Sequence, residues 1–250
     1  MKKFCIVIPV YTEHLEKTEE ISLIRLWNMI GSKNYDVYLI HPNNIDIKDY
    51  LVIYKDLISL PIDPQWFTSL ATYSKLWMSY SFYDLFYNYK YMYIHQLDSY
   101  LFYDRLEYWC DMRYDYCGGP IFSKFSTWKL ENENGEYEPK VGNGGFSLRK
   151  IATFKEITDP NGSFRKNYEI TDEKLSKIYI EDKYFCNTIS KIYLLEMPSW
   201  LEALQFSWDC SLEFIWDNLK IHTLPMACHG FKNWIDFWKV HIPELSIFNQ

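Results

Sequence analysis

Residues 4–10, FCIVIPV, form a short run of apolar and largely β-branched side chains. Such a run is typical of a strand that is buried on both faces, as in a parallel sheet. Because it follows Met1-Lys2-Lys3, it also resembles the start of a signal peptide. The run is short, however, contains Pro9, and leads into Thr12-Glu13-His14 without a small-residue cleavage site. We therefore predict that this stretch is a first buried strand.

Strand and helix patterns alternate from this strand through the first hundred residues. The apolar spacing predicts helices over residues 18–30, 46–54 and 69–86, and strands over residues 36–41, 57–60 and 91–97. Such alternation predicts βαβ units and a mostly parallel sheet. Ligands of such sheets bind beyond the carboxyl ends of the strands, so the polar residues just after each strand are the first candidates for a site.

The second half of the chain is less regular. Residues 123–140 are polar and predict a long loop or hairpin, which in a compact domain is often functional. Farther along, we predict helices over residues 149–157, 181–189 and 199–206, and a strand over residues 191–195. No internal repeat or linker divides the sequence, so we expect a single domain over residues 1–250.

Composition and charge narrow the classes of function. The 250-residue chain has a net charge of −7 and no basic run, which argues against a general nucleic-acid binder. Its 22 Tyr, 16 Phe and 10 Trp are an unusually large aromatic content. Most of these side chains are expected in the core, and the remainder would suit stacking against a sugar or a base.

The spacing of the cysteines and the hydropathy indicate in which cellular compartment the protein is expected. Six cysteines lie at positions 5, 110, 117, 186, 210 and 228, and no pair has Cys-x-x-Cys spacing, so neither a zinc site nor a redox pair is indicated. Together with the missing signal peptide and membrane span, this favours a cytoplasmic protein with reduced thiols. The aromatic tail around Phe231, Trp234 and Trp238 is expected to pack in the core. Peripheral contact with the inner face of a membrane is the alternative.

Two elements are the strongest candidates for chemistry. Asp98 ends an apolar strand, where a carboxylate faces the ligand crevice and can hold a divalent cation or a ribose hydroxyl; a turn or helix-capping Asp is the structural alternative. Residues 142–149, GNGGFSLR, hold three of the nine glycines, and these would let the backbone approach a ligand closely. A tight turn leading into a strand is the alternative here.

Two further elements carry weaker signals. Glu181 and Asp182 open a predicted helix, where acids are favoured by the helix dipole alone, but such an acid can also act as a general base on a hydroxyl. His229 is an isolated histidine of the kind that is usually structural. It would complete a metal or diphosphate site only if the fold brought it to Asp98.

Taken in order, these residues resemble the GT-A-fold nucleotide-sugar glycosyltransferases. More narrowly, the chain resembles a mainly microbial group of glycosyltransferase-like proteins that was classed as a domain of unknown function. The similarity covers most of the chain, and its motifs are VIPVY at residues 7–11, YIHQLDSYLF at 93–102, YDYCGGP at 114–120, GNGGFSLR at 142–149, Glu181-Asp182, and LPMACHGF at 224–231. The resemblance implies a single Rossmann-like α/β/α sandwich. Its nucleotide-binding half would be about residues 1–110, and its acceptor-binding half about residues 111–250.

The resemblance also implies roles for single residues. Asp182, with Glu181 beside it, would be the general base of an inverting transfer. Asp98 and His229 would be the metal ligands. The donor would lie against Pro9, Val10, Tyr11, Lys75, Asp98, Ser99, Tyr100, Asn143, Gly144 and Gly145. From their place in or beside the long loop, we predict acceptor stacking on Phe122, Phe125 and Trp128.

One position departs from the family pattern. Tyr100 stands where the Asp-x-Asp signature has its second acid. A Mn²⁺ or Mg²⁺ cofactor is therefore expected only if His229 compensates, and otherwise a basic residue such as Lys75 would neutralise the diphosphate.

The sequence thus predicts a glycosyltransferase with a nucleotide-sugar donor, UDP-linked by preference, acting in polysaccharide biosynthesis. The sugar would be transferred to a hydroxyl of a glycan or a lipid-linked acceptor. A non-catalytic nucleotide- or carbohydrate-binding protein, or an inactive partner subunit on the same fold, is the alternative that Tyr100 favours. A nucleotidyl- or phosphoryl-transfer enzyme is disfavoured by the lack of a P-loop or a basic phosphate-binding signature.

Overall fold

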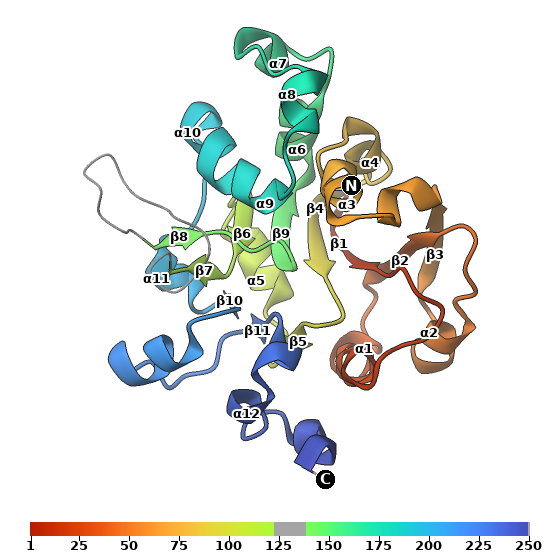
Figure 1. Cartoon of the computed structure of the whole chain (residues 1–250), viewed down its shortest axis with the longest axis vertical. Coiled ribbons are helices and arrows are strands. Elements are labelled where there is room, and N and C mark those ends of the chain that lie inside the picture. Colours follow the sequence, from red (N-terminus) through yellow and green to blue (C-terminus); the bar gives the residue numbers. More distant parts are fainter. Residues whose placement is uncertain (123–138, 250) are drawn as a thin grey trace.

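A computed structural model describes residues 1–122 and 139–249 (Figure 1). Its centre is a six-stranded sheet in the order β3-β2-β1-β4-β9-β6. These strands are β1 (Lys2–Pro9), β2 (Asp36–Pro42), β3 (Ile58–Ile62), β4 (Tyr89–His95), β6 (Tyr116–Gly118) and β9 (Phe146–Lys150). The pairs β3–β2, β2–β1 and β1–β4 are parallel, and β9 alone runs opposite to its neighbours β4 and β6. The predicted mostly parallel sheet is confirmed.

Alternation along β1 shows why the sheet is covered on both faces. Phe4, Ile6 and Ile8 lie in one apolar cluster, and Cys5 and Val7 lie in another, because successive side chains of a strand point to opposite faces. The first cluster contains residues of α1 (Lys17–Ile30), α2 (Lys48–Ile53) and α5 (Leu106–Asp111). The second contains residues of α3 (Leu70–Trp77), α4 (Tyr80–Asp84) and α6 (Ile151–Thr158). The fold is therefore the α/β/α sandwich that the sequence predicted.

Two small sheets adjoin the central one. In the first, β11 (Ala227–Cys228) pairs with β10 (Ser207–Trp208) in parallel and with β5 (Tyr100–Leu101) in antiparallel fashion. The second joins β7 (Pro120–Ile121) to β8 (Lys140–Val141). A third apolar cluster packs the C-terminal segment onto the first small sheet, so Phe231 and Trp238 are fully buried while Trp234 is 44% exposed. Most of the aromatic tail thus packs in the core.

The remaining helical elements are short. They are η1 (Pro64–Phe67), α7 (Ser163–Asn167), α8 (Asp172–Ser176), α9 (Glu181–Lys183), a π-helix at Tyr184–Ile189, α10 (Ser190–Tyr193), α11 (Trp200–Ala203), a π-helix at Phe214–Asn218, a 3₁₀ helix at Phe231–Trp234, α12 (Ile235–Trp238) and a 3₁₀ helix at Pro243–Asn249. All six cysteines are free. None of the helices in the described ranges is both long and apolar enough to cross a membrane.

Two predicted elements are wrong. Residues 191–193 belong to α10, not to a strand, and Arg149 and Lys150 end β9 instead of opening α6. The run at residues 191–195 is too short for its apolar periodicity to separate helix from strand, and the second error is a shifted boundary, since the helix is present as α6 from Ile151 onward.

Candidate functional site

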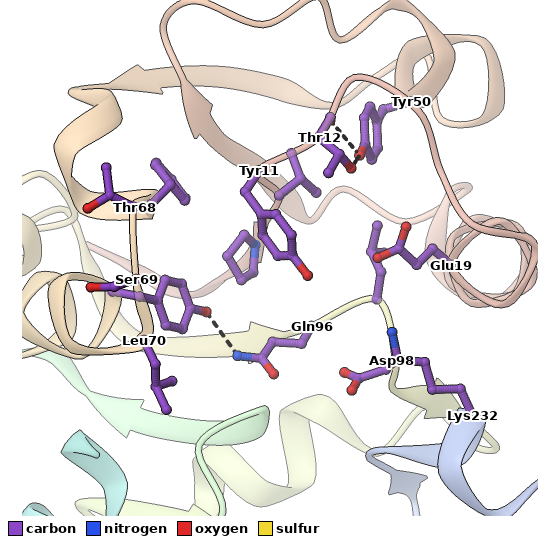
Figure 2. A pocket seen from close by; sticks show the side chains of 15 residues that line it. Tyr11, Thr12, Glu19, Tyr50, Thr68, Ser69, Leu70, Gln96, Asp98 and Lys232 are labelled. Carbon is purple, nitrogen blue, oxygen red and sulfur yellow. Dashed lines mark hydrogen bonds between the residues drawn. The ribbon is translucent and has the colours of Figure 1, made fainter. Parts of the chain in front are cut away.

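A cavity of about 390 Å³ opens at the carboxyl ends of β1 and β4. This is the edge where ligands of parallel sheets bind. Its wall includes the predicted donor-binding residues Pro9, Val10, Tyr11 and Asp98. In Figure 2, Gln96 and Asp98 face the same hollow, with Tyr11 across from them. The other lining residues are Thr12, Glu19, Tyr50, Phe67, Thr68, Ser69, Leu70, Tyr73, Leu97 and Lys232.

The first small sheet brings Asp98 and His229 together. His229 follows β11, and Asp209 follows the parallel strand β10, so both side chains emerge at the same end of the sheet. Because β5 runs antiparallel to β11, with Tyr100 opposite Cys228, the segment that precedes β5 meets that end too. Asp98 lies in this segment. The His229–Asp98 contact that the sequence left conditional is therefore present.

His229 bridges two carboxylates. Its Nε2 lies 3.1 Å from Asp98 Oδ1 and 3.0 Å from Gln96 Oε1, and its Nδ1 lies 2.9 Å from Asp209 Oδ1. Burial alone would lower the pKa of His229, but the charge of Asp98 and the hydrogen bond to Asp209 outweigh it and raise the pKa to about 10. Burial alone would likewise raise the pKa of Asp98, yet the charge of His229 holds that pKa below its usual range. The two groups thus stabilise each other in their charged forms.

The turn that precedes β9, residues 142–145 (the glycine turn), lies beside His229 because β9 is antiparallel to β4. The start of β9 meets the end of β4, and the Gln96 N–H donates to the Gly145 carbonyl at 2.9 Å. A Cβ on Gly145 would lie 2.0 Å from His229 Nε2, so only glycine permits this contact. Asn143 holds the turn, with φ of 53°, by accepting the Gly145 N–H at 3.0 Å.

Asp182 lies on α9 and is hydrogen-bonded to the same turn. Its Oδ2 accepts the Gly144 N–H at 2.8 Å, and its Oδ1 accepts the Lys183 N–H at 2.7 Å. Burial, and then the charge of Glu181, raise the pKa of Asp182 to about 6. Glu181 itself is buried and forms an ion pair with Arg149, with Oε1 3.2 Å from Nη2. Of the two adjacent acids, Asp182 has the environment of a proton acceptor that works near neutral pH.

Several predicted site residues do not line the cavity. Asn143, Gly144, Gly145, Glu181, Asp182 and His229 are not among its lining residues, and His229 is connected to it through its contacts with Asp98 and Gln96. Lys75 lines a separate hollow with Met78, Tyr80 and Arg165. Tyr100 is 3% exposed, packs among core aromatics and donates its hydroxyl to Glu244 at 3.3 Å. Ser99 is fully buried.

The predicted acceptor residues are only partly described. Phe122 is buried, and its ring centroid lies 5.2 Å from that of Phe214 and 5.8 Å from that of Trp200. Phe122 therefore packs in the core. Phe125 and Trp128 lie outside the described residues.

Three polar residues near Asp98 and His229 were missed from the sequence. Asp209 follows a two-residue strand that leaves no periodic signal, and Lys232 lies in a tail interpreted as packing. Gln96 shares the strand end with Asp98, and its amide donates to the Tyr73 hydroxyl at 2.9 Å. Gln96 and Asp98 lie two residues apart, so a search for polar side chains on both sides of Asp98 would have found Gln96.

The residues that the structure describes include no group of three or more His, Cys, Asp or Glu side chains arranged as a metal site. Among the described residues, the arrangement most similar to a metal site is the pair Asp98 and His229, with the amide oxygen of Gln96 beside them. An imidazole, a carboxylate and an amide oxygen are ligands that Mn²⁺ accepts. The donor chemistry thus fits a divalent cation, with one carboxylate fewer than the Asp-x-Asp signature would supply.

Comparison with solved structures identifies the fold. The structure of mouse xyloside xylosyltransferase 1 in its apo form aligns with a TM-score of 0.55 at 8% identity, over 91% of this chain and 97% of the other. The galactosyltransferase LgtC, in complex with donor and acceptor sugar analogs, aligns at 0.55 and 9% identity, over 90% and 86%. The apo-form glycosyltransferase GlyE of Streptococcus pneumoniae aligns at 0.53 and 13% identity, over 92% and 54%. These likenesses show that the fold is that of GT-A glycosyltransferases.

Comparison of sequences identifies the family. No curated protein matches the chain. One family model does match, over residues 58–229, and its description is protein of unknown function (DUF5672). This range includes Asp98, the glycine turn, Asp182 and His229. Since the match covers well over half of the sequence, the chain belongs to the DUF5672 family, on a GT-A glycosyltransferase fold.

Proposed function

We propose that this protein is a glycosyltransferase that moves a sugar from a nucleotide-sugar donor to a hydroxyl of a glycan or glycolipid acceptor. A UDP-linked donor is favoured. The observation that carries the proposal is the junction at Gly144-Gly145, which contacts His229, the ion-pair partner of Asp98, on one side and Asp182 on the other. The residues proposed to hold the diphosphate and the residue proposed to accept the proton would thus be connected through two consecutive glycines.

The donor is proposed to occupy the cavity. Pro9, Val10 and Tyr11 would lie against the base, in the nucleotide-binding half of the chain. Lys232 brings positive charge to the wall of the cavity, and His229 brings a second positive charge to Asp98 from behind that wall. Lys232, and not Lys75, is thus our candidate for neutralising the diphosphate. Fixed cations that face a departing diphosphate stabilise the charge that develops on it.

A divalent cation would be held by Asp98 and by His229, once its Nε2 has given up its proton, with the Gln96 amide oxygen as a third ligand. The Asp209 carboxylate orients the imidazole through Nδ1, as outer-shell carboxylates do for ligating histidines. When bound, Mn²⁺ or Mg²⁺ supplies charge stabilisation to the leaving diphosphate.

Asp182 is proposed to deprotonate the acceptor hydroxyl, which then attacks the anomeric carbon from the side opposite the nucleotide. This route inverts the anomeric configuration. A general base is most effective when its pKa is close to the working pH, which the raised pKa of Asp182 satisfies.

A panel of nucleotide sugars, tested for donor hydrolysis and transfer with and without Mn²⁺, tests the proposal. We expect Asp182→Asn to lower kcat by about 10²–10⁴-fold while nucleotide binding, followed by thermal shift, persists. In the wild type, kcat should rise with pH through a midpoint near 6, because only the ionised Asp182 accepts a proton. Near-normal transfer by Asp182→Asn, or a product that retains the donor's configuration, would contradict the assignment.

A second candidate function is non-catalytic binding of a nucleotide or carbohydrate on the same fold, for example by an inactive partner subunit. The burial of Tyr100 favours this candidate. The second acid of the Asp-x-Asp signature is absent, and the residue in its place has its side chain in the core. Nucleotide-dependent stabilisation without turnover of any donor, hydrolysis included, would support this candidate over the first.

A further inference from the structure

Arg149 is a buried cation in an aromatic cage. Its side chain is fully buried, and its guanidinium carbon lies 5.3 Å from the ring centroid of Trp77 and 5.5 Å from that of Phe154. Tyr116 and Phe185 complete the cage at 5.8 and 5.9 Å. Its Nε has no hydrogen-bond partner among the described residues. Such a site is costly to build, and apolar side chains could replace its charges with little loss of stability, so stability alone does not account for it.

Glu181 is the carboxylate that neutralises this cation. Its Oε1 lies 3.2 Å from Arg149 Nη2, and its Oε2 lies 3.1 Å from the Ser74 hydroxyl of α3. Both oxygens are therefore engaged inside the protein. Glu181 is thus buried and ion-paired, whereas its direct neighbour Asp182 is only partly buried and is held by backbone N–H groups.

The ion pair packs against the residue that holds Asp182. A Cβ on Gly144 would lie 2.9 Å from Glu181 Oε1, 3.1 Å from Arg149 Nη2 and 3.3 Å from Asp182 Cβ. The Gly144 N–H in turn donates to Asp182 Oδ2 at 2.8 Å. The ion pair and the Asp182 carboxylate thus share one glycine as their contact surface.

We propose that Arg149 and Glu181 are positioning residues, whose ion pair holds the first turn of α9 against Gly144 and sets both the direction and the charge surroundings of Asp182. The chemical part of this role rests on the proposed function, in which Asp182 is the base. The effect of the ion pair on the position and ionisation of Asp182 does not depend on that function.

The charged and titratable groups around Asp182 give the sign of the effect. Glu181 on α9 disfavours its ionisation, while Arg149 on β9 and the backbone N–H groups of Gly144 and Lys183 favour it. Tyr116 on β6 and Cys186 on the π-helix are buried neutral groups whose own pKa values are raised, with Asp182 among the causes. The Lys183 side chain is exposed. Removing the charge of Glu181 should therefore lower the pH at which Asp182 ionises.

Glu181→Gln tests this with little change of shape. The Gln amide can donate to Ser74 Oγ, whose own proton already has an acceptor in the Tyr179 carbonyl at 2.9 Å, and its oxygen can accept from Arg149. The titration of Asp182 is followed by NMR of protein labelled with ¹³Cγ-Asp, and the resonance is assigned as the one missing from Asp182→Asn. We expect the midpoint to fall by about one pH unit in Glu181→Gln.

Two more variants separate positioning from general stability. In the double variant Glu181→Gln/Arg149→Met, the midpoint should lie between those of Glu181→Gln and the wild type, because removing Arg149 acts in the opposite sense. Asp115→Asn is the matched control, since Asp115 is a buried acid in another ion pair, 2.9 Å from Lys150 Nζ. It should lose thermal stability without moving the Asp182 midpoint.

The outcomes separate this proposal from the function it builds on. An Asp182 midpoint that does not move in Glu181→Gln overturns the positioning role, whatever the activity. A midpoint that moves, with a pH–rate profile that moves equally, supports both proposals. A midpoint that moves while the pH–rate profile stays fixed, or while no donor is turned over, supports the positioning role and counts against Asp182 as the catalytic base.

Discussion

At the residue scale, Gly145 is the most sensitive position in the candidate site. A methyl group there would lie 2.0 Å from His229 Nε2, far inside any allowed contact. Gly145→Ala must therefore displace His229 from Asp98 and Gln96. We expect the Kd for UDP, measured by isothermal titration calorimetry, to rise at least tenfold, since the cation near the diphosphate loses its place.

Gly162→Ala is the matched control for this glycine. Its added Cβ would lie 3.0 Å from the Asp159 side chain, in a surface turn before α7. This variant should bind UDP as the wild type does. If Gly145→Ala also binds UDP normally, His229 does not take part in donor binding.

Tyr100 gives a second prediction at the residue scale. Its ring is in the core and its hydroxyl is shared with Glu244 at 3.3 Å, so Tyr100→Phe should cost no more than about 1 kcal/mol. Tyr100→Asp restores the signature in sequence but places a carboxylate in the core, and should cost about 3–5 kcal/mol in urea unfolding. Tighter Mn²⁺ binding by Tyr100→Asp would show that position 100 can face the site after all.

The site residues that could be predicted from the sequence are those whose type and order indicate a function. The residues that were missed reach the site only through the tertiary fold. The glycine turn, Asp98, Asp182 and His229 stand out by type and order. Asp209 and Lys232 do not, because they reach the site through two-residue strands and a tail. Lys75 was predicted at the donor but lines another hollow, since it lies two residues beyond Tyr73 on α3 and so faces another side of that helix.

At the element scale, the start of α3 connects local stability to the cavity. Ser69 is its N-cap, accepting the Thr72 N–H at 3.2 Å, while Thr72 Oγ1 accepts the Ser69 N–H at 3.0 Å. Ser69 and Leu70 also line the cavity. Ser69→Ala should lower the free energy of unfolding by about 1 kcal/mol and weaken UDP binding, because the first turn frays.

Ser199→Ala is the control for that prediction. Ser199 caps α11 in the same way, accepting the Glu202 N–H at 3.2 Å, but does not line the cavity. It should lose similar stability in urea unfolding and keep its affinity for UDP. Equal losses of affinity in both variants would mean that α3 has no special part in binding.

The strands of the central sheet were easier to predict than those of the first small sheet. Residues of β1, β2 and β4 are buried on both faces, which produces the apolar runs visible in the sequence. The two-residue strands β5, β10 and β11 are stabilised only by the sheet that they form together. No short window of sequence contains that information, since β5 and β11 lie more than 120 residues apart in the chain.

At the scale of the whole molecule, the predicted nucleotide-binding and acceptor-binding halves share one core. Strands β6 and β9 of the second half complete the sheet begun by the first, and Tyr93 packs with Leu148 and Phe206 in one cluster. We therefore predict that the full chain unfolds in one cooperative transition, with coincident circular dichroism and fluorescence curves. The isolated fragment 1–110 should show no such transition, and a cooperative melt of that fragment would contradict the single-domain prediction.

The small sheet formed by β10, β11 and β5 also determines at what stage of synthesis the site can form. Gln96 and His229 are 133 residues apart in sequence, yet they meet at 3.0 Å. During synthesis, β1 to β4 leave the ribosome long before β11, so a shorter nascent chain lacks both the completed core and the cation that faces Asp98. Under the proposed function, a ribosome-stalled or prematurely ended chain would thus be unable to hold the donor, and donor binding should begin only after His229 has left the ribosome.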